Sequence, residues 1–316
     1  MRNNFLKIFT IIAFSLSTLF SGSAFAHDGK KYTIGFAAAN LQADFFNFIK
    51  ESVEAETARL GHNSIVVDSG GDDAKQVSQI EDLLVKQIDA LVLIISGNTD
   101  GNAQIRKAKE AGIPVITVDR NTTNPPGDSF IASDSEVAAY EMGMWVAEQT
   151  GGEGIVGVIQ GQLGSTPEIA RDTGFENAIA QYPGLNTVEK QASKMWSRDE
   201  GVSIAQDLLT RNPEITVLFG RCDALAQGAA QAAKAMGRDD ILVVGFDGDR
   251  AALQDLKNNN TLLAATMTQQ TLTIGRNAVR FAIDAIEGRY IPSEMLYGST
   301  LTTPGNVDQF MGEGHP

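Results

Sequence analysis

The stretch Ile241-Leu242-Val243-Val244-Gly245-Phe246-Asp247-Gly248 decides the fold class of this chain. It opens with apolar or small residues rich in β-branched side chains, which is typical of a strand buried on both faces of a parallel sheet. An aromatic ring, a carboxylate and a glycine follow at the carboxyl end of that strand. Ligands of open α/β sheets bind beyond the carboxyl ends of the strands, so we expect Phe246 and Asp247 to reach a binding site.

Strand and helix patterns alternate along the rest of the chain. Short apolar runs predict strands at 33–38, 64–67, 90–95, 115–118, 130–132, 155–159, 187–190, 217–220 and 262–267. Helical spacing predicts helices at 45–60, 77–84, 102–111, 167–181, 198–209, 223–236 and 272–286, and a further one from residue 135. This alternation predicts an α/β protein with parallel sheets flanked by helices. Two successive sets of about five strands favour two similar lobes over an eight-stranded barrel, for which the strand count is high.

The first residues have the pattern of a secretory signal peptide. Arg2 and Lys7 give a positive start, residues 8–19 are mostly apolar, and Ala24-Phe25-Ala26 has the spacing of a cleavage site. A membrane anchor is the alternative, but the apolar run is shorter than the roughly 18 residues that a span requires. A lipid anchor would need a cysteine next to the cleavage site, and the sequence has none there. We therefore predict a cleaved signal at 1–26 and a protein of the periplasm.

The composition narrows the classes of partner. The formal net charge is −14, and no basic cluster occurs along the chain. This acidic charge balance argues against nucleic acids and anionic membranes as binding partners, but it is compatible with a neutral ligand. The lone cysteine, Cys222, cannot form an intrachain disulfide, so stability must come from the core.

Motifs for catalysis are weak or missing. Of three histidines, His27 and His315 lie near the ends of the chain and His62 ends a predicted helix, which argues against a histidine-based triad or metal site. The Gly-rich loop 161–166 lacks the lysine of a phosphate-binding loop, and 247–249 is too short for a calcium loop. No carboxylate pair of the glycosidase type stands out. We predict that the protein is not an enzyme and uses no cofactor or metal.

Polar and aromatic side chains recur where the predicted strands end. They are Asn40, Gln42, Asp44, Phe45, Phe46, Asp119, Arg120, Arg171, Trp196, Arg221, Cys222, Asp223, Phe246, Asp247 and Gln269. A sugar or polyol needs this mixture, because its hydroxyls pair with planar donors and acceptors while its C–H face packs on aromatic rings. The sequence therefore predicts a site for a small sugar or polyol.

Several of these residues also have a purely structural interpretation. Of the adjacent Phe45 and Phe46, at most one is expected to face the core. The other structural alternatives are helix caps at Asp134 and Asp223, an ion pair at Asp119-Arg120, a solvated helix residue at Arg171, lobe packing at Trp196 and a small buried residue at Cys222.

A set of ordered stretches matches a known family. They are 32–36, Phe45-Phe46, 113–120, 131–134, Arg171 with Gly174-Phe175, 243–248, and 264–266 leading to Gln269. Over nearly all of its length after the signal, the chain resembles the periplasmic sugar-binding proteins of the ribose-binding type, which serve ABC importers.

The resemblance implies two lobes joined by a three-segment hinge, with ligand-driven closure. The three crossings are expected near Ser133, Gln269 and Met295. The N-terminal lobe is then 27–133 plus 270–294, and the C-terminal lobe is 134–269 plus 295–316. Carried over, Phe45, Phe46, Trp196 and Phe246 resemble the ring-stacking residues. Asp119, Arg120, Arg171, Asp247 and Gln269 resemble the hydroxyl-binding set.

Two positions depart from the family pattern. Ala43 and Cys222 stand where the ribose binders have asparagines, so two amides that could each pair with two hydroxyls are missing. A site built to bond a hydroxyl discriminates strongly through that bond, which argues against D-ribose as the ligand. The candidate specificity positions are Asn40, Gln42, Ala43, Asp44, Arg221 and Cys222.

The sequence analysis leads to a monomeric periplasmic receptor that captures a small sugar or polyol between its lobes and delivers it to an ABC permease. Alternatives are a sugar sensor that docks on a chemoreceptor or sensor kinase through the same fold, and a secreted glycoside-acting enzyme. Intracellular repressors share the fold, but they carry a DNA-binding segment where this chain has its predicted signal.

Overall fold

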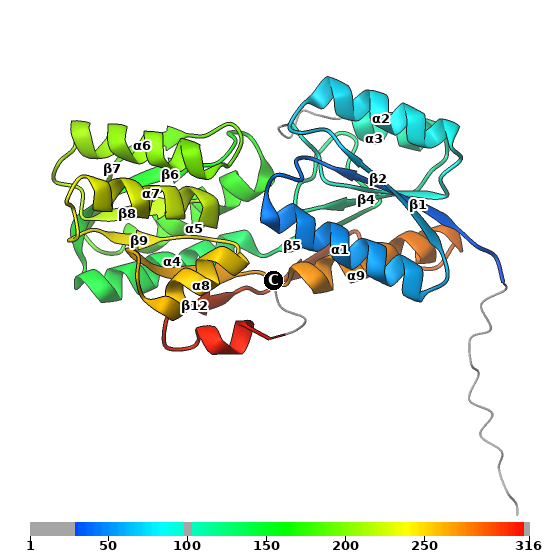
Figure 1. Ribbon diagram of the computed structural model, residues 1–316. Helices are drawn as coiled ribbons and strands as arrows, with labels where there is room; N and C mark the ends of the chain where they lie inside the picture. Colours follow the sequence, from blue (N-terminus) through cyan, green and yellow to red (C-terminus); the bar gives the residue numbers. More distant parts are fainter. Residues whose placement is uncertain (1–28, 98–102, 313–316) are drawn as a thin grey trace, which may run out of the picture. The chain divides into compact units, whose positions relative to one another are not determined.

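Figure 1 shows the computed structural model, which describes residues 29–97 and 103–312. The described residues from Tyr32 onward form one compact unit, and the predicted signal peptide at 1–26 lies outside the described residues. Among the helices that the structure describes, none has the length and apolar character needed to span a membrane.

The first sheet has six strands in the order β11-β5-β4-β3-β1-β2, and all of its pairings are parallel. Its strands are β1 (Thr33–Ala38), β2 (Asn63–Asp68), β3 (Ala90–Leu93), β4 (Val115–Val118), β5 (Ser129–Ser133) and β11 (Glu294–Tyr297). Its helices are α1 (Asp44–Arg59), α2 (Asp73–Val85), α3 (Ala103–Glu110) and α9 (Thr271–Ile286). Helices α1 and α9 pack together on one face, and α2 and α3 cover the other (Figure 1).

The second sheet repeats the plan in the order β12-β10-β9-β8-β6-β7. Its strands are β6 (Glu153–Gln160), β7 (Gly184–Ala192), β8 (Val217–Gly220), β9 (Leu242–Val244), β10 (Leu263–Thr268) and β12 (Thr300–Thr302). Its helices are α4 (Ser135–Thr150), α5 (Thr166–Ile179), α6 (Arg198–Arg211), α7 (Asp223–Ala235) and α8 (Arg250–Asn258), with a 3₁₀ turn η1 (Val307–Phe310). The sequence predicted a parallel sheet, and all strands of this sheet are parallel except β12, which runs antiparallel to β10.

The two sheets have the same arrangement of strands around the point where the strand order reverses. In each sheet the order of the strands reverses at one point. Strand β1 lies between β2 and β3 in the first sheet, and β6 lies between β7 and β8 in the second. This reversal of strand order opens a crevice at the carboxyl ends of the strands. The two-lobed α/β architecture predicted from the sequence is present, and the alternative eight-stranded barrel is wrong.

The chain passes between the sheets three times, and one crossing differs from its prediction. The first two lie between β5 and α4 and between β10 and α9, near Ser133 and Gln269. The third was expected near Met295, but Met295 pairs with Ile131 inside the first sheet, and the chain leaves that sheet only after Tyr297. Strand β11 is a half-exposed edge strand, so it lacks the continuous apolar run that reveals a buried strand. The sequence analysis also did not predict α8, β12 or η1.

Candidate functional site

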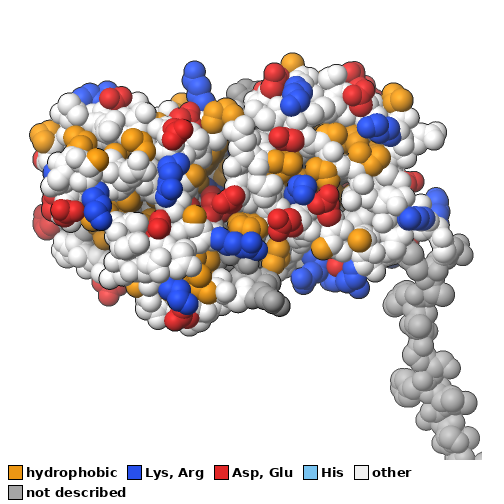
Figure 2. Space-filling view, viewed as in Figure 1, with side chains coloured by type: hydrophobic (Ala, Val, Ile, Leu, Met, Phe, Trp, Pro, Cys, Tyr) orange, Lys and Arg blue, Asp and Glu red, His pale blue; other side chains and the backbone are white. Residues whose placement is uncertain are grey.

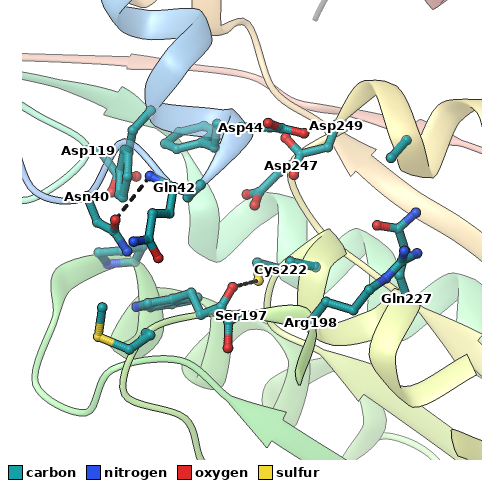
Figure 3. Close-up of a pocket in the computed structure, with 18 of the residues that line it drawn as sticks. Asn40, Gln42, Asp44, Asp119, Ser197, Arg198, Cys222, Gln227, Asp247 and Asp249 are labelled. Atoms are coloured by element: carbon teal, nitrogen blue, oxygen red, sulfur yellow. Dashed lines mark hydrogen bonds between the residues drawn. The ribbon is translucent and has the colours of Figure 1, made fainter. Parts of the chain in front are cut away.

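A cavity of about 340 Å³ lies where the carboxyl ends of the two sheets meet (Figure 3). This size falls in the usual range for small-molecule sites. Nine residues were predicted to bind the ligand and six to be specificity positions, and twelve of these fifteen line the cavity: Asn40, Gln42, Ala43, Asp44, Phe45, Phe46, Asp119, Arg120, Arg171, Trp196, Cys222 and Asp247. The structure therefore brings together side chains that lie up to about 200 residues apart in the sequence.

Three predicted residues do not line the cavity. Phe246 is wholly buried in the second lobe, and the guanidinium carbon of Arg171 lies 3.9 Å from its ring centroid. Gln269 donates from Nε2 to Asp247 Oδ1 at 2.7 Å. Phe246 and Gln269 thus support Arg171 and Asp247 from behind, and the expectation that Phe246 faces the ligand is wrong.

Arg221 also points away from the cavity, contrary to its prediction as a specificity position. Its side chain is wholly buried, and Cζ lies 4.6 Å from the ring centroid of Phe219. It donates from Nη1 to the carbonyl of Arg171 and from Nη2 to Asp172 Oδ1 at 2.6 Å. A residue at a strand end can turn either to the ligand or to the core, and Arg221 turns to the core because its charge partners lie there.

The adjacent phenylalanines both face the cavity. Phe45 and Phe46 are each 6% exposed and meet edge to face, with ring centroids 5.4 Å apart. They lie in the first turn of α1, which begins at Asp44. The expectation that at most one of them would face the core is wrong, because both also pack against the core of the first lobe.

Trp196 supplies an aromatic wall from the second lobe. Its ring lies directly over Gly161, where any Cβ would overlap the indole. The guanidinium carbon of Arg120 lies 5.9 Å from the centroid of the Trp196 ring, and that of Arg171 lies 5.8 Å from it. Both arginines are therefore within cation–π distance of this ring. The Gly-rich loop at 161–166 therefore makes room for an aromatic ring, and Trp196 is a cavity residue as predicted.

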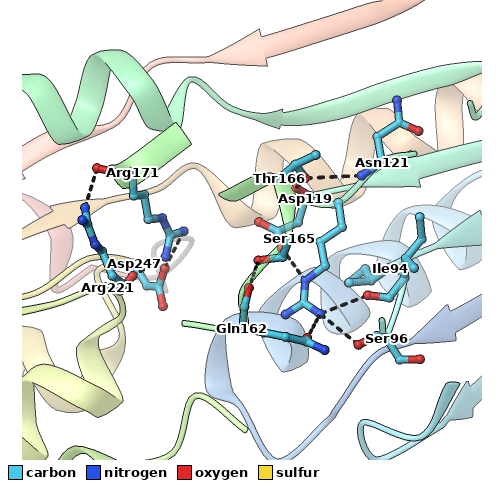
Figure 4. Close-up of polar contacts among 12 residues, drawn as sticks. Ile94, Ser96, Asp119, Asn121, Gln162, Ser165, Thr166, Arg171, Arg221 and Asp247 are labelled. Carbon is cyan, nitrogen blue, oxygen red and sulfur yellow. Dashed lines mark hydrogen bonds and ion pairs between the residues drawn. The ribbon is translucent and has the colours of Figure 1, made fainter. Parts of the chain in front are cut away.

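Arg120 ties the first lobe to the second. Its Nη1 donates to the carbonyls of Ile95 (3.1 Å) and Ser96 (3.3 Å) and to Gln162 Oε1 (3.1 Å), as Figure 4 shows. Its Nε lies 3.6 Å from Asp119 Oδ2. The Asp119-Arg120 ion pair is thus present, and both of its members also line the cavity.

Arg171 is buried at 2% exposure, so the alternative of a solvated helix residue is wrong. Its Nη1 donates to the carbonyl of Arg221, and its Nη2 lies 3.3 Å from Asp247 Oδ1 (Figure 4). Arg171 and Arg221 therefore each hold the backbone of the other. This reciprocal pairing sets the Arg171 guanidinium in place before any ligand arrives.

Asp223 shapes the loop that carries Asp247. It accepts from the backbone N–H groups of Gly248 and Asp249, each at 2.8 Å, and from Thr266 Oγ1 at 2.6 Å. A Cβ at Gly245 would overlap its carboxylate, which explains the glycine before Phe246. Asp223 is therefore a loop-holding residue, and the cap of α7 is Cys222. Burial raises the pKa of Asp223 to about 6.

Three cavity residues have strained backbones. Asp119, Trp196 and Asp247 have positive φ angles of 62°, 58° and 130° although none is glycine. Such conformations cost about 1–3 kcal/mol each and persist only where the surroundings enforce them, most often at functional sites. The strain aims these three side chains at one cavity.

Burial dominates the electrostatics of the site. It raises the pKa of Asp247 to about 8, against the attraction of Arg171 and with repulsion from Asp223 and Asp119. It also raises the pKa of Asp119 and, strongly, that of Asp249. The buried Cys222 thiol has a pKa raised well above its usual value, and its Sγ lies 3.5 Å from the Trp196 carbonyl. A protonated thiol in this position is a weak hydrogen-bond donor and not a nucleophile.

The sequence analysis missed several lining residues: Pro167, Met195, Ser197, Arg198, Ala224, Gln227, Asp249 and Ala251. Asp249 was the one with a signal, since it lies two residues after Asp247 at the same strand exit. The others lie on helix starts and loops beside predicted residues and have no pattern of their own. Within the described ranges, no group of three His, Cys, Asp or Glu side chains could hold a metal ion.

Residues 34–289 match the family model described as "Periplasmic binding protein domain". The chain belongs to the periplasmic binding protein family. It is 32% identical over 262 residues to the ribose import binding protein of Bacillus subtilis, which covers 83% of this chain and 84% of the relative.

Solved structures of ABC transporter solute-binding proteins have the same fold. One from Bacillus halodurans with bound myo-inositol superposes with a TM-score of 0.83 at 26% identity, covering 90% of this chain and 99% of the other. One from Mycobacterium smegmatis with bound glycerol superposes with a TM-score of 0.85 at 27% identity, covering 90% and 98%. The family and fold implied by the sequence resemblance are confirmed.

On the face shown in Figure 2, lysines and arginines are interspersed with acidic side chains and form no continuous basic patch. A continuous basic stripe would be the electrostatic footprint of a nucleic-acid partner.

Proposed function

We propose that this protein captures a small sugar or polyol in the cavity between its lobes and delivers it to the permease of an ABC importer. The observation that carries the proposal is the lining of one cavity by three aromatic rings and two pre-positioned arginine–carboxylate pairs. Rings accept the C–H face of a sugar, and the charged pairs accept and donate hydrogen bonds to its hydroxyls. The ligands of the solved relatives, myo-inositol and glycerol, are polyols.

Capture by closure follows from how the cavity is divided. Phe45, Phe46 and Arg120 come from the first lobe, whereas Trp196 and Arg171 come from the second. A ligand that contacts both walls stabilises the arrangement in which they approach, since it binds that state better than an open one. The three chain crossings form the hinge about which the walls would move.

Export and assembly complete the proposal. We infer that residues 1–26 direct the chain to the periplasm and are cleaved there, and that the receptor acts as a monomer. A permease recognises the closed pair of lobes, which couples ligand capture to transport. A pure sensor would use the same cavity and would be distinguished by the partner that binds the closed form.

The test is isothermal titration calorimetry of the purified protein against pentoses, hexoses, polyols and their amino derivatives, preceded by a thermal-shift screen. A ligand that binds only the native state raises the free energy of unfolding, by about 2.7 kcal/mol at a ligand concentration of a hundred times Kd. The melting temperature rises as a result. We expect stoichiometric binding without turnover. Absence of binding across the panel would refute the proposal, and hydrolysis of a glycoside would indicate an enzyme instead.

A further inference from the structure

Two carboxylates in the cavity have no hydrogen-bond donor within the described chain. Asp249, which precedes α8, is only 8% exposed, and its side chain does not cap the helix or accept any hydrogen bond. Asp44, the first residue of α1, faces it from the other lobe; Asp44 is exposed to solvent, and its carboxylate has no protein partner in the described ranges. Figure 3 shows the two carboxylates next to each other at one end of the cavity.

The other two carboxylates of the cavity are differently placed. Asp119 lies 3.6 Å from Arg120, and Asp247 lies 3.3 Å from Arg171 and accepts from Gln269. Each therefore has a cation of its own. Asp44 and Asp249 have no cation of this kind in the described ranges, and they lie beside Asp247 at the end of the cavity away from Asp119.

Neighbouring polar groups are committed elsewhere. Arg198 lines the cavity, but its guanidinium is half exposed and lies 3.9 Å from Asp255. Gln227 donates from Nε2 to Asp255 Oδ2 at 2.6 Å. Asp44 is exposed, and water can hydrate its carboxylate. Asp249 is almost wholly buried, so a hydrogen-bond donor from a ligand in the cavity would relieve the cost of leaving it without a partner.

The number of donors and the charge identify the group. A neutral hydroxyl carries one hydrogen and no charge, so it satisfies one carboxylate and leaves the repulsion between the two. A primary ammonium carries three hydrogens and a positive charge, so it can donate to both and offset their repulsion.

We propose that the ligand of this cavity is an amino sugar or amino polyol, whose ammonium group binds between Asp44 and Asp249. This inference rests on the proposed function and names the ligand class of that site. The hydroxyls of the same ligand face Arg120 and Arg171, and its carbon frame packs between the aromatic rings. Burial, together with Asp247, Asp223 and Asp44, raises the pKa of Asp249, and a bound cation reverses that effect.

The experiment compares matched ligands on the wild-type protein at pH 7. D-Glucose, D-glucosamine and N-acetyl-D-glucosamine form one set, the galactose and mannose counterparts form two more, and sorbitol with 1-amino-1-deoxysorbitol forms a fourth. We expect the amine to bind about tenfold to a hundredfold more tightly than its hydroxyl counterpart, as for a hydrogen bond to charged groups. The N-acetylated form, which has the nitrogen but not the charge, should not share this gain.

The variants Asp44→Asn and Asp249→Asn assign the preference to these residues. Each should reduce the amine-to-hydroxyl affinity ratio, measured for both ligands on the same variant, to near one. Asp240→Asn, an equal change at an exposed carboxylate paired with Arg238, is the matched control and should keep the wild-type ratio.

The possible outcomes separate this inference from the proposed function. Binding of neutral sugars or polyols as tightly as their amines would overturn the inference and leave the proposed function standing. A strong amine preference that persists in both Asn variants would also overturn it, because the ammonium would then bind elsewhere. Failure of every ligand in the panel would refute the proposed function itself.

Discussion

The two arginines that line the cavity are held in different ways. Arg171 is held entirely within the second lobe, by the carbonyl of Arg221, by Asp247 and by the ring of Phe246. Arg120 is held by two carbonyls of its own lobe and also by Gln162 of the second lobe. The second wall of the site is therefore pre-formed, whereas the first wall depends in part on the approach of the other lobe. The following predictions test this difference, from the largest expected effect to the smallest.

Removing the buried guanidinium behind Arg171 should destabilise the whole second lobe. Arg221→Met leaves the buried Glu168 without its ion-pair partner, removes one of the two cations next to Asp172, and frees the carbonyl of Arg171. We expect the free energy of unfolding to fall by about 3–5 kcal/mol, measured by urea denaturation, because a buried charge loses its partner. Arg211→Met is the control, since Arg211 is a half-exposed arginine with a surface partner. A loss equal to that of the control would mean that Arg221 does not organise this wall.

The carboxylates of the second wall should make stability depend on pH. The pKa of Asp247 is raised to about 8 in the folded state from an ordinary value of 3.8, so the folded protein binds more protons than the unfolded chain between these values. The free energy of unfolding of the ligand-free protein should therefore fall as pH rises from 5 to 8, by up to about 1.4 kcal/mol per pH unit for one such group. Chemical denaturation across this range measures it.

The control for the pH experiment is Asp247→Asn, which should reduce the slope; Asp223, Asp249 and Asp119, whose pKa values are also raised by burial, account for the remainder. Glu56 has the opposite shift, with a pKa lowered to about 2 by Arg59 and Arg280. Its contribution is lost only as pH falls below about 4.5, outside the measured window. Stability that rises with pH between 5 and 8 would contradict the prediction and would mean that Asp247 is ionised together with Arg171.

Removing the pre-formed arginine should weaken ligand binding. Arg171→Ala should cost at least about 1.5 kcal/mol of binding free energy, or roughly a tenfold increase in Kd by calorimetry, because a charge-assisted hydrogen bond is lost. Arg250→Ala, which changes an exposed arginine over Phe48, should leave Kd unchanged. Equal Kd values for the wild type and Arg171→Ala would show that Arg171 only supports the core.

The contact between the lobes should have the smallest effect. Gln162→Ala removes the hydrogen bond from Arg120 across the lobes, and a neutral acceptor of this kind contributes about 0.5–1.5 kcal/mol. We expect faster ligand release in stopped-flow measurements and a larger radius of gyration of the ligand-free protein by small-angle scattering. Gln181→Ala, an exposed glutamine on the second lobe, should change neither quantity. If both variants behave alike, Arg120 does not depend on the second lobe.

The sequence predicted most of the fold because the relevant signals are local. Strands β3, β4 and β8 are runs of four buried residues, and such runs can be recognised without knowing what packs on them. Strand β11 and helix α8 were missed because one is a half-exposed edge and the other is nine residues long. The third crossing was misplaced by the same edge strand, whose pairing with β5 is a contact more than 160 residues away.

The sequence also located the site, but not the direction of each side chain. Phe246 and Asp247 are neighbours just beyond the end of β9, and only the second lines the cavity, on a backbone with a positive φ that the sequence did not indicate. Arg171 and Arg221 are both buried arginines beside strand ends, and only the first lines the cavity. Asp249 was visible in the sequence, yet nothing local marked it as a carboxylate without a partner.

What the sequence by itself determined is the family, the two parallel sheets and the set of side chains at their carboxyl ends, because these follow from short apolar runs and the residues next to them. Only the tertiary structure decided which charges are paired. Arg171 meets Asp247 and Arg221 across 50 to 76 residues, and Asp44 meets Asp249 across the two lobes. The energy of a buried polar group depends on partners brought together by folding, so the buried Asp249 became recognisable as a carboxylate without a partner only once the other charges around it had been assigned theirs.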